Sequence, residues 1–371
     1  MIDLEARGLP IDVDEIGRIA DETEQEIKKV EVQIKELFGE CNVSSPKQVV
    51  AMLRDKDYHP KSSAKDALKS LAEEHPDAGI NLLLEHRELT KRLTATLRPL
   101  AAQAINGRVH GQFNQLGTKT GRFSSSNPNL QTIPRGRVRD IIRAPHGRAL
   151  VSVDYSAIEL RAAAAITQEP TMSAAFNRGD DLHRLTASKV LGKPAEEVTK
   201  SDRQIAKGIN FGLLFGSGAE GLRGYCRASY GVLISEEESV RFREAFMRAY
   251  PKIAQWQAEA KRRAYKGGCQ MAFTKIGRRC LFDDGASDWR RFSTTLSVAV
   301  QGTCADGLKM AMIALARELP ATAHIVATLH DEIMVECDVA DKPSVADLTA
   351  QVMQREMSKL LPGVKIETES K

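Results

Sequence analysis

The sequence has 371 residues, which is long enough for two or three packed units, and its 42% hydrophobic and 27% charged residues argue against wholesale disorder. No stretch approaches the ~18 consecutive apolar residues of a membrane helix, and the first residues carry no visible secretory signal. The net charge of 53 − 49 = +4 is too small by itself to indicate a nucleic-acid partner.

The first third of the chain is predicted to be helical. Residues 14–38 form an amphipathic pattern in which Glu24–Lys28 and Glu31–Lys35 are favourable i,i+4 pairs. A loop-rich stretch with a short helix at 46–54 follows. Two further periodic segments then come at 64–75 and 78–104. The simplest interpretation is an elongated all-helical unit from about 14 to 105.

The character of the sequence changes after residue 106. Glycine, serine and proline cluster in a turn-rich segment over 107–134. Beyond it, strands are predicted at 149–155, at 269–282 as strand–turn–strand, and around the polar HDE of 330–332 as a hairpin. Helices are predicted at 158–166, 181–191, 199–215, 235–265, 294–317 and 343–361. The pattern indicates a mixed α+β unit interrupted by a helical insertion.

Charge and cysteines are unevenly distributed along the chain. Residues 1–40 carry twelve acids and five bases, whereas residues 101–150 carry eight bases and one acid. The basic stretch is a candidate phosphate-contacting surface, with a solvated loop as the equally weighted alternative. The cysteines form no CxxC pair, which disfavours a disulfide scaffold or zinc ribbon and favours a reducing compartment. They are Cys41, Cys226, Cys269, Cys280, Cys304 and Cys337.

Acidic residues are predicted at the ends of two strands. Asp154 ends an apolar strand, and Asp331 and Glu332 occupy the turn of the predicted hairpin. Carboxylates that meet at the rim of a sheet can hold divalent cations through hard oxygen ligands. The ordinary alternative is that aspartate is simply common at strand ends and turns.

The helix predicted over 199–215 presents cations and aromatic rings on one face. Arg203, Lys207 and Phe211 recur every four residues, with Phe215 at the edge of the face. Cations suit a triphosphate and rings suit a base, while the alternative is a basic stripe beside a core face. Gly208 and Gly212 each cost about 1 kcal/mol inside a helix, which indicates close approach of a ligand or another chain, or mobility. A P-loop motif is absent, which disfavours that class of NTPase.

An ordered set of motifs resembles the family A DNA polymerases, the class that includes bacterial DNA polymerase I and many phage replicases. The motifs are TGRFSSSNPNLQTIP (120–134), DYSAIELR (154–161), DLHRLTA (181–187), RQIAKGINFGLLFG (203–216), VQGTCAD (300–306) and LHDE (329–332). The resemblance implies a right-hand polymerase fold, with a palm of antiparallel sheet plus helices, helical fingers and a helical thumb. The implied divisions are a lead-in at 1–19, thumb at 20–105, palm at 106–175, fingers at 176–284 and palm again at 285–371.

The resemblance implies a two-metal nucleotidyl transfer. Asp154 and Asp331 would bind two Mg²⁺ ions, for which Mn²⁺ can substitute, with the carbonyl of Tyr155 as a further ligand and Glu332 in support. Arg203 and Lys207 would grip the incoming triphosphate, and Lys207 would also be the general acid toward pyrophosphate.

The resemblance also assigns nucleotide and DNA contacts. Further nucleotide contacts would come from His183, Phe211, Phe215, Tyr155 and Glu159, the last of which would block a ribose 2′-hydroxyl. Contacts to DNA would come from Arg122, Asn129, Gln131, Gln301 and His330. For each of these residues, the alternative to a ligand contact is simple surface or core packing. This alternative carries substantial weight for Gln301 and His330.

Several positions depart from the family pattern. The family usually has Gln at Ala157, Tyr at Phe215 and a second Arg at Gln204, and often has Arg and Asn at Ser293 and Ser297. Loss of the tyrosine hydroxyl at Phe215 puts ribonucleotide exclusion and fidelity in doubt. The serines at positions 293 and 297 put the family's contacts to the DNA minor groove in doubt.

We therefore expect a DNA-directed DNA polymerase in replication or repair, acting on primer–template DNA and dNTPs. We expect a monomer with no membrane partner, located in the cytoplasm of a bacterial or phage-infected cell, with an organellar origin left open. The family's 3′–5′ exonuclease and 5′-nuclease domains have no counterpart in these residues, so we expect no proofreading. A separately encoded exonuclease or processivity factor, or a longer parent protein, remains open.

Two other functions compete with this one. A single-subunit RNA polymerase shares the palm architecture, but Glu159 argues against it because such enzymes must leave room for the 2′-hydroxyl. A non-catalytic DNA-binding protein with a polymerase fold is the other, and the retention of Asp154, Asp331, Arg203 and Lys207 argues against it.

Overall fold

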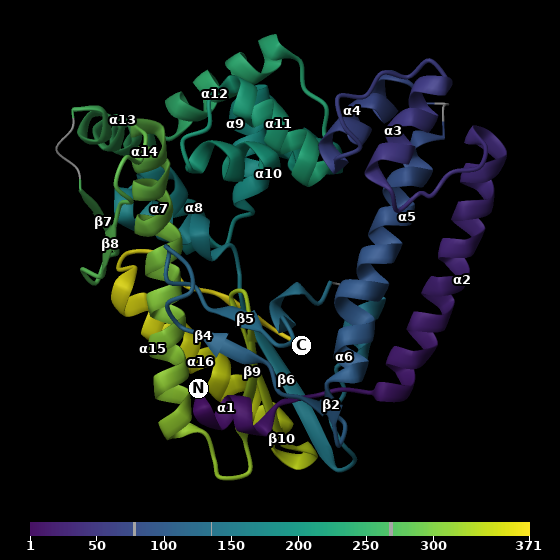
Figure 1. The fold of residues 1–371 in the computed structure, drawn as a ribbon. Coiled ribbons are helices and arrows are strands. Elements are labelled where there is room, and N and C mark those ends of the chain that lie inside the picture. The colour runs from purple at the N-terminus through teal and green to yellow at the C-terminus, as the bar shows by residue number, and fades with distance from the viewer. Residues whose placement is uncertain (77–78, 135, 267–269) are drawn as a thin grey trace. The chain divides into compact units, whose positions relative to one another are not determined.

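The structure, a computed structural model, describes residues 1–76, 79–134, 136–266 and 270–371. Its contacts divide the chain into two units, each of which is described by itself below (Figure 1). Unit 1 comprises Met1–Gln112 and Ser125–Pro145, and unit 2 comprises Phe113–Ser124 and His146–Lys371. The short strands β4 (Gln112–Asn114) and β5 (Ser124–Ser126) lie where the chain passes between the units.

Unit 1 is mainly helical, as its periodicity predicts. Its helices are α1 (Ile2–Arg7), α2 (Val13–Phe38), α3 (Pro46–Asp55), α4 (Lys65–Glu74), α5 (Ile80–Arg92), the π-helix η1 (Leu93–Leu97), α6 (Arg98–Ala102), and the 3-10 turns η2 (Leu130–Thr132) and η3 (Arg137–Ile141). A small antiparallel sheet has the order β1 (Leu9–Pro10), β3 (Arg108–Val109), β2 (Ala104–Ile105). Apolar residues of α2 to α5 share one buried cluster, which includes Ile34, Leu53, Leu68 and Leu83.

The long helix α2 is defined by its ends and by its buried stripe. Asp12 caps it by accepting a hydrogen bond from the Glu15 N–H, and Gly39 ends it at a φ of 87°. The i,i+4 ion pairs expected on its surface are replaced by longer-range partners. Glu24 pairs with Arg98, Glu31 with His86, and Lys35 with Glu40.

Unit 2 combines one sheet with many helices, and the predicted α+β class is confirmed. The helices are α7 (Ile158–Thr167), α8 (Pro170–Arg178), α9 (Leu182–Leu191), η4 (Ala195–Glu197), α10 (Lys200–Leu214), α11 (Ala219–Tyr230), α12 (Glu236–Ala249), α13 (Pro251–Tyr265), α14 (Asp288–Ser297), the π-helix η5 (Val298–Gly302), α15 (Thr303–Glu318), η6 (Val339–Asp341) and α16 (Lys342–Leu360).

The sheet of unit 2 is antiparallel throughout. Its order is β11 (Thr368–Ser370), β6 (Arg148–Tyr155), β10 (Glu332–Asp338), β9 (His324–Leu329). Helix α16 packs against β6, β10 and β11 and against α15 (Figure 1). A separate hairpin pairs β7 (Met271–Phe273) with β8 (Arg279–Leu281), as the sequence predicts.

Two predicted helices have different bounds in the structure. The single helix expected over 235–265 is wrong, because it breaks between α12 and α13 at Tyr250. This residue precedes Pro251, and the proline ring excludes it from the helical conformation, so it takes φ −129° and ψ 69°. The helix expected from 294 starts earlier, at Asp288, since Ser287 caps it. Helices α8 and α11 were not predicted.

The helical run Asp288–Glu318 is long and apolar enough, by length and composition, to cross a membrane. However, 67% of its most apolar window is buried inside the protein. A core helix passes the same test, so the run is only weak support for a membrane span.

Candidate active site

The sheet of unit 2 brings acidic residues of β6 and of the β9–β10 turn together. Glu332 lies directly opposite Asp154 in the antiparallel register, and directly opposite residues place their side chains on the same face. The Tyr155 N–H donates to the Asp331 carbonyl at 3.4 Å. Asp331 itself follows His330, which is exposed and takes the turn at a φ of 58°. The rim of the sheet therefore carries both Asp154 and Asp331.

Two neighbours of these aspartates are held by buried hydrogen bonds. The Tyr155 hydroxyl donates to the Met353 carbonyl on α16 at 2.8 Å, and burial raises its pKa well above the usual value. Ser152 donates to the Glu332 carboxylate, which is 6% exposed. Tyr155 is thus a neutral anchor between sheet and helix. Its contribution to a metal site would come from the main-chain carbonyl.

Arg122 lies between two acids of this region. Its Nη2 donates to Glu159 at the start of α7 and lies 3.9 Å from Oδ1 of Asp331. Burial alone would lower the pKa of Arg122, but the charges of Asp331 and Glu159 more than offset this and raise it. The pKa of Glu159 is raised by burial, while Arg122 and a hydrogen bond with Gln301 oppose that shift. Arg122, Glu159, Gln301 and Asp331 therefore form one charged group.

Cys304 belongs to the same region and was not singled out from the sequence. It is 2% exposed on α15, and its thiol lies 3.8 Å from the Ile158 carbonyl. Burial raises its pKa well above the usual value, and the Asp331 and Glu159 charges raise it further. The thiol is neutral there. The sequence signal that could have marked Cys304 was its position three residues after Gln301 on the same helical run.

A second group forms between α9 and α10. The capping box of Thr199 and Asp202 starts α10. From that helix the Arg203 Nε donates to Asp181 Oδ2 at 2.5 Å. The same Asp181 caps α9 by accepting from the main-chain N–H groups of His183 and Arg184. Burial would raise the pKa of Asp181, but Arg203 and the Arg184 N–H hold it below the usual value.

His183 lies inside this second group. Its Nδ1 is 2.9 Å from Asn210 Nδ2, and its ring centroid is 5.9 Å from that of Phe211. Burial lowers its pKa to about 4, with Asp181 opposing the shift and Arg203 and Lys207 adding to it. His183 is therefore neutral at pH 7. Arg203, Lys207 and Phe211 share the helix face that their spacing predicts.

The oxygen donors at the sheet rim fit a hard divalent cation. The carboxylates of Asp154 and Asp331 and the carbonyl of Tyr155 are the ligand types that Mg²⁺ and Mn²⁺ prefer. In the part of the chain that the structure describes, no group of three or more His, Cys, Asp or Glu side chains is placed to hold a metal. A cation there would depend on two carboxylates, one carbonyl and ligands from outside the chain.

Comparisons with known proteins place the chain in a family. The family model of DNA polymerase family A matches residues 13–371. The chain belongs to this family. It is 36% identical to DNA polymerase I of Aquifex aeolicus over 377 residues, which cover 99% of this chain and 64% of that protein. It is 33% identical to the thermostable DNA polymerase I of Thermus aquaticus, over 95% of this chain and 44% of that protein.

A solved structure shares the fold. The POL domain of Pol1 from M. smegmatis, in complex with DNA primer-template and dNTP, matches with a TM-score of 0.87 and 29% identity. The match covers 99% of this chain and 67% of that one. The family A chain spans less than two thirds of the length of both curated relatives named above.

Packing explains the presence of Gly208 and Gly212 in this family A chain, a question that the sequence left open. A Cβ on Gly208 would lie 2.6 Å from the Cys226 Sγ, and one on Gly212 would lie 2.9 Å from a Leu222 methyl group. Both neighbours are on α11, an unpredicted helix. The close approach is therefore made by another helix of the same chain.

Some residues that the family resemblance assigns to the site lie outside both the group around Arg122 and the group between α9 and α10. Phe215 ends α10 and packs against the buried cluster of Phe292 and Leu296, so its ring belongs to the core on that side. Asn129 and Gln131 lie in unit 1, where the Asn129 side chain accepts from the Gln131 N–H at 3.1 Å. Ala157, which departs from the family pattern, directly precedes α7 and has a φ of 50°, a conformation that non-glycine residues rarely adopt.

Two residues of the second group were missed by sequence reasoning. Asp181 opens the DLHRLTA motif, and an aspartate directly before a helix is a cap signal that could have marked it. Asn210 is fully buried and bridges His183 to the Thr186 hydroxyl. Its sequence signals were its place inside the RQIAKGINFGLLFG motif and its polarity among apolar residues of a helix.

Proposed function

We propose that this chain is a template-directed DNA polymerase that joins deoxynucleotides to a primer 3′-hydroxyl. Membership of family A supports the activity, and a relative of the same fold binds DNA primer-template and dNTP. The observation that supports the proposal is the register of the sheet, which sets Glu332 opposite Asp154 and the Asp331 main chain beside Tyr155, with the cations of α10 in the same unit.

The reaction forms a bond between the primer 3′-oxygen and the α-phosphorus and releases pyrophosphate. Asp154, Asp331 and the Tyr155 carbonyl would hold two divalent cations, with Glu332 in support. The cations would lower the pKa of the primer 3′-hydroxyl and would neutralise the negative charge that develops during the reaction. Arg203 and Lys207 bind the triphosphate, and Lys207 gives a proton to the leaving pyrophosphate.

Other residues select the nucleotide and align the DNA. Phe211 packs on the sugar and base beside the neutral His183, whereas Phe215 at the end of the helix packs against the core. Glu159, held by Arg122, takes the space of a 2′-hydroxyl. The contacts to DNA come from Arg122, Asn129, Gln131, Gln301 and His330.

Primer extension with the wild type and Asp154→Asn tests the proposal. We expect the wild type to extend a 5′-labelled primer with four dNTPs and Mg²⁺, and Asp154→Asn to lose at least about 100-fold in rate, because it removes a metal-binding charge. Asp347→Asn, which neutralises an exposed aspartate on α16, is the matched control.

Two results would contradict the proposal. Tight primer–template binding by a wild type that never extends would favour the non-catalytic DNA-binding protein. Faster extension with ribonucleotides than with deoxynucleotides would favour the RNA polymerase. The expected lack of proofreading stays a prediction for this chain, and an unshortened primer in the absence of nucleotides would support it. The monomeric state and the cytoplasmic location also stay predictions.

A further inference from the structure

The loop that carries Arg122 has little regular structure of its own. Between β4 and β5, its described internal hydrogen bonds include those from Gly121 N–H to the Thr118 carbonyl at 3.0 Å and from the Thr118 hydroxyl to the Arg122 carbonyl at 3.0 Å. Leu116 at its tip is 80% exposed. Hydrogen bonds of this kind do not set the direction of a long side chain, so the loop depends on contacts from elsewhere in unit 2.

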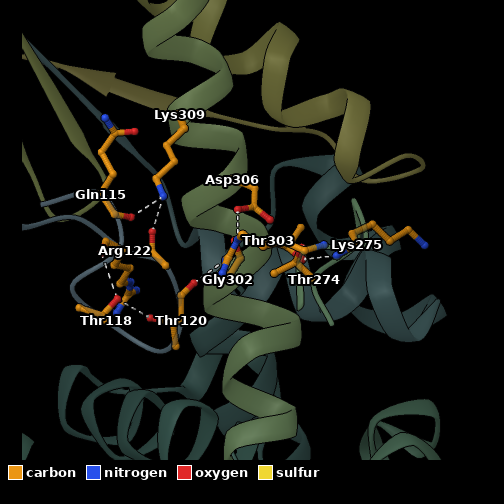
Figure 2. Close-up of polar contacts among 12 residues, drawn as sticks. Gln115, Thr118, Thr120, Arg122, Thr274, Lys275, Gly302, Thr303, Asp306 and Lys309 are labelled. Atoms are coloured by element: carbon orange, nitrogen blue, oxygen red, sulfur yellow. Dashed lines mark hydrogen bonds and ion pairs between the residues drawn. The ribbon is translucent and has the colours of Figure 1, made fainter. Parts of the chain in front are cut away.

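Lys309 on α15 supplies the first of these contacts. Its Nζ donates to the Gln115 carbonyl at 2.9 Å and to the Gly121 carbonyl at 2.7 Å, so that it closes the two ends of the loop (Figure 2). The ammonium also lies 5.2 Å from the ring centroid of Phe123. Burial lowers the pKa of Lys309. Because the Lys309 ammonium donates to main-chain carbonyls of the loop, its role is to hold the loop in place.

Arg278, next to β8, supplies the second contact. Its Nη2 donates to the Thr120 carbonyl at 2.6 Å, and its Nε donates to Asp306 on α15 at 2.7 Å. The Asp306 side chain is 3% exposed, so this ion pair is well shielded from water. Figure 2 shows Asp306 and Lys309 projecting from the same helix beside the loop.

The hairpin that carries Arg278 is itself fixed to α15. The Lys275 N–H at the hairpin turn donates to the Thr303 hydroxyl at 2.9 Å. The packing against the loop is tight, because a Cβ on Gly121 would lie 2.5 Å from the Arg278 guanidinium carbon. Thr120 and Gly121, the residues directly before Arg122, are therefore held from two sides.

We propose that Lys309 and Arg278 are positioning residues that direct Arg122 toward Asp331 and Glu159. The proposal rests on the proposed function, since it assigns to Arg122 a place beside the reacting groups. A released loop would leave Glu159 and Asp331, which are partly buried, without their counter-charge. The rate of the chemical step would then fall more than the affinity for nucleotide or DNA.

A double-mutant cycle tests this with Arg122→Ala, Lys309→Met and their combination. We expect Lys309→Met to lower kcat by about tenfold to 100-fold, as small misplacements do, with KM for dNTP changed little. We expect the double variant to be no slower than Arg122→Ala alone, because Lys309 acts through Arg122. Lys309→Arg, which keeps donors and charge, should recover part of the rate. Lys261→Met is the control, since it removes an exposed lysine that lies over the Tyr265 ring.

Hydrogen–deuterium exchange gives a readout that does not need activity. Lys309→Met and Arg278→Met should speed exchange in residues 114–124 and leave β6 and β10 unchanged. Unchanged exchange in that loop, or additive losses of kcat in the cycle, would overturn the positioning role. A wild type without polymerase activity would instead defeat the proposed function, and exchange in the loop would still decide the positioning role.

Discussion

His183 shows at the scale of one residue how surroundings set the charge of a site. It lies in a half-buried position under the influence of the charges of Asp181, Arg203 and Lys207, and its ring contacts the Asn210 side chain. Burial prevails over the nearby aspartate, because a charged imidazole would lose its hydration there. The neutral ring adds no positive charge beside Arg203 and Lys207.

The lowered pKa of His183 predicts an acid-sensitive contribution to stability. The pKa is about 4 in the folded chain against 6.5 for an ordinary histidine. The stabilisation is therefore present above pH 6.5 and is lost as the pH falls through about 4. Urea titrations should show that the wild type loses up to about 3 kcal/mol more than His183→Gln between these pH values.

An exposed histidine of the same unit provides the comparison for this measurement. His146→Gln should follow the wild-type curve over the same range, because His146 is exposed. Parallel curves for His183→Gln and the wild type would show that burial of His183 does not disfavour its charged form.

At the scale of elements, the position of helix α10 depends on its packing against neighbouring helices. One face carries Arg203, Lys207 and Phe211, and another side packs against α11 through Gly208 and Gly212. A glycine is unfavourable inside a helix, so its presence is explained by the contact that it permits. The position of the cation face is therefore determined by packing elsewhere on the helix.

Two glycine-to-alanine substitutions test this packing. Gly208→Ala should destabilise the protein by about 1–2 kcal/mol, since the strain of a tight core contact outweighs the gain in helix propensity. Gly224→Ala on α11 should stabilise it by about 0.5–1 kcal/mol, because no atom lies within 4 Å of the place that the added methyl group would take. Urea unfolding of both variants checks this. Equal stabilisation by the two would show that the α10–α11 contact does not require glycine.

At the scale of the whole molecule, the opposite charges of residues 1–40 and 101–150 meet. In unit 1, Arg137 pairs with Glu22 and Arg143 pairs with Asp12 at 2.8 Å. In unit 2, Arg148 of the basic segment pairs with acids of β10. Much of the basic segment is therefore neutralised within the chain, and charge counting alone overstates its attraction for phosphate.

Release of one of these arginines predicts a measurable gain in DNA affinity. Glu22→Gln removes the partner of Arg137, whose side chain is 61% exposed. If the segment contacts phosphates, the affinity for primer–template at low salt should rise by about two- to fivefold, as expected for one exposed charge. Equilibrium binding by fluorescence anisotropy measures it.

The control for this charge effect lies on the same helix. Glu36→Gln also removes one exposed acid from α2 and should raise the affinity less. Equal gains for both variants would favour the alternative in which the basic segment is a solvated surface.

Much of this protein was predictable because the signals are local. The periodicity of residues 14–38 and the pattern over 199–215 predicted α2 and α10, and the apolar runs around 330–332 predicted the β9–β10 hairpin. The four-residue spacing of Arg203, Lys207 and Phe211 is enough to put them on one helix face. The ordered motifs identified the family, which the comparisons confirmed.

Other features were decided only by the tertiary structure. The sequence by itself determined most of the elements, though not α8, α11 or the break at Tyr250, and it determined the family and the residue types at the site, because helix spacing and strand alternation act between near neighbours. It did not determine that Arg122 lies between Glu159 and Asp331, that Asp181 holds Arg203, or that Lys309 closes the Arg122 loop. These partners are 22 to 209 residues apart by sequence number (203 − 181 and 331 − 122). Only the packing of helices and the register of the sheet bring them together.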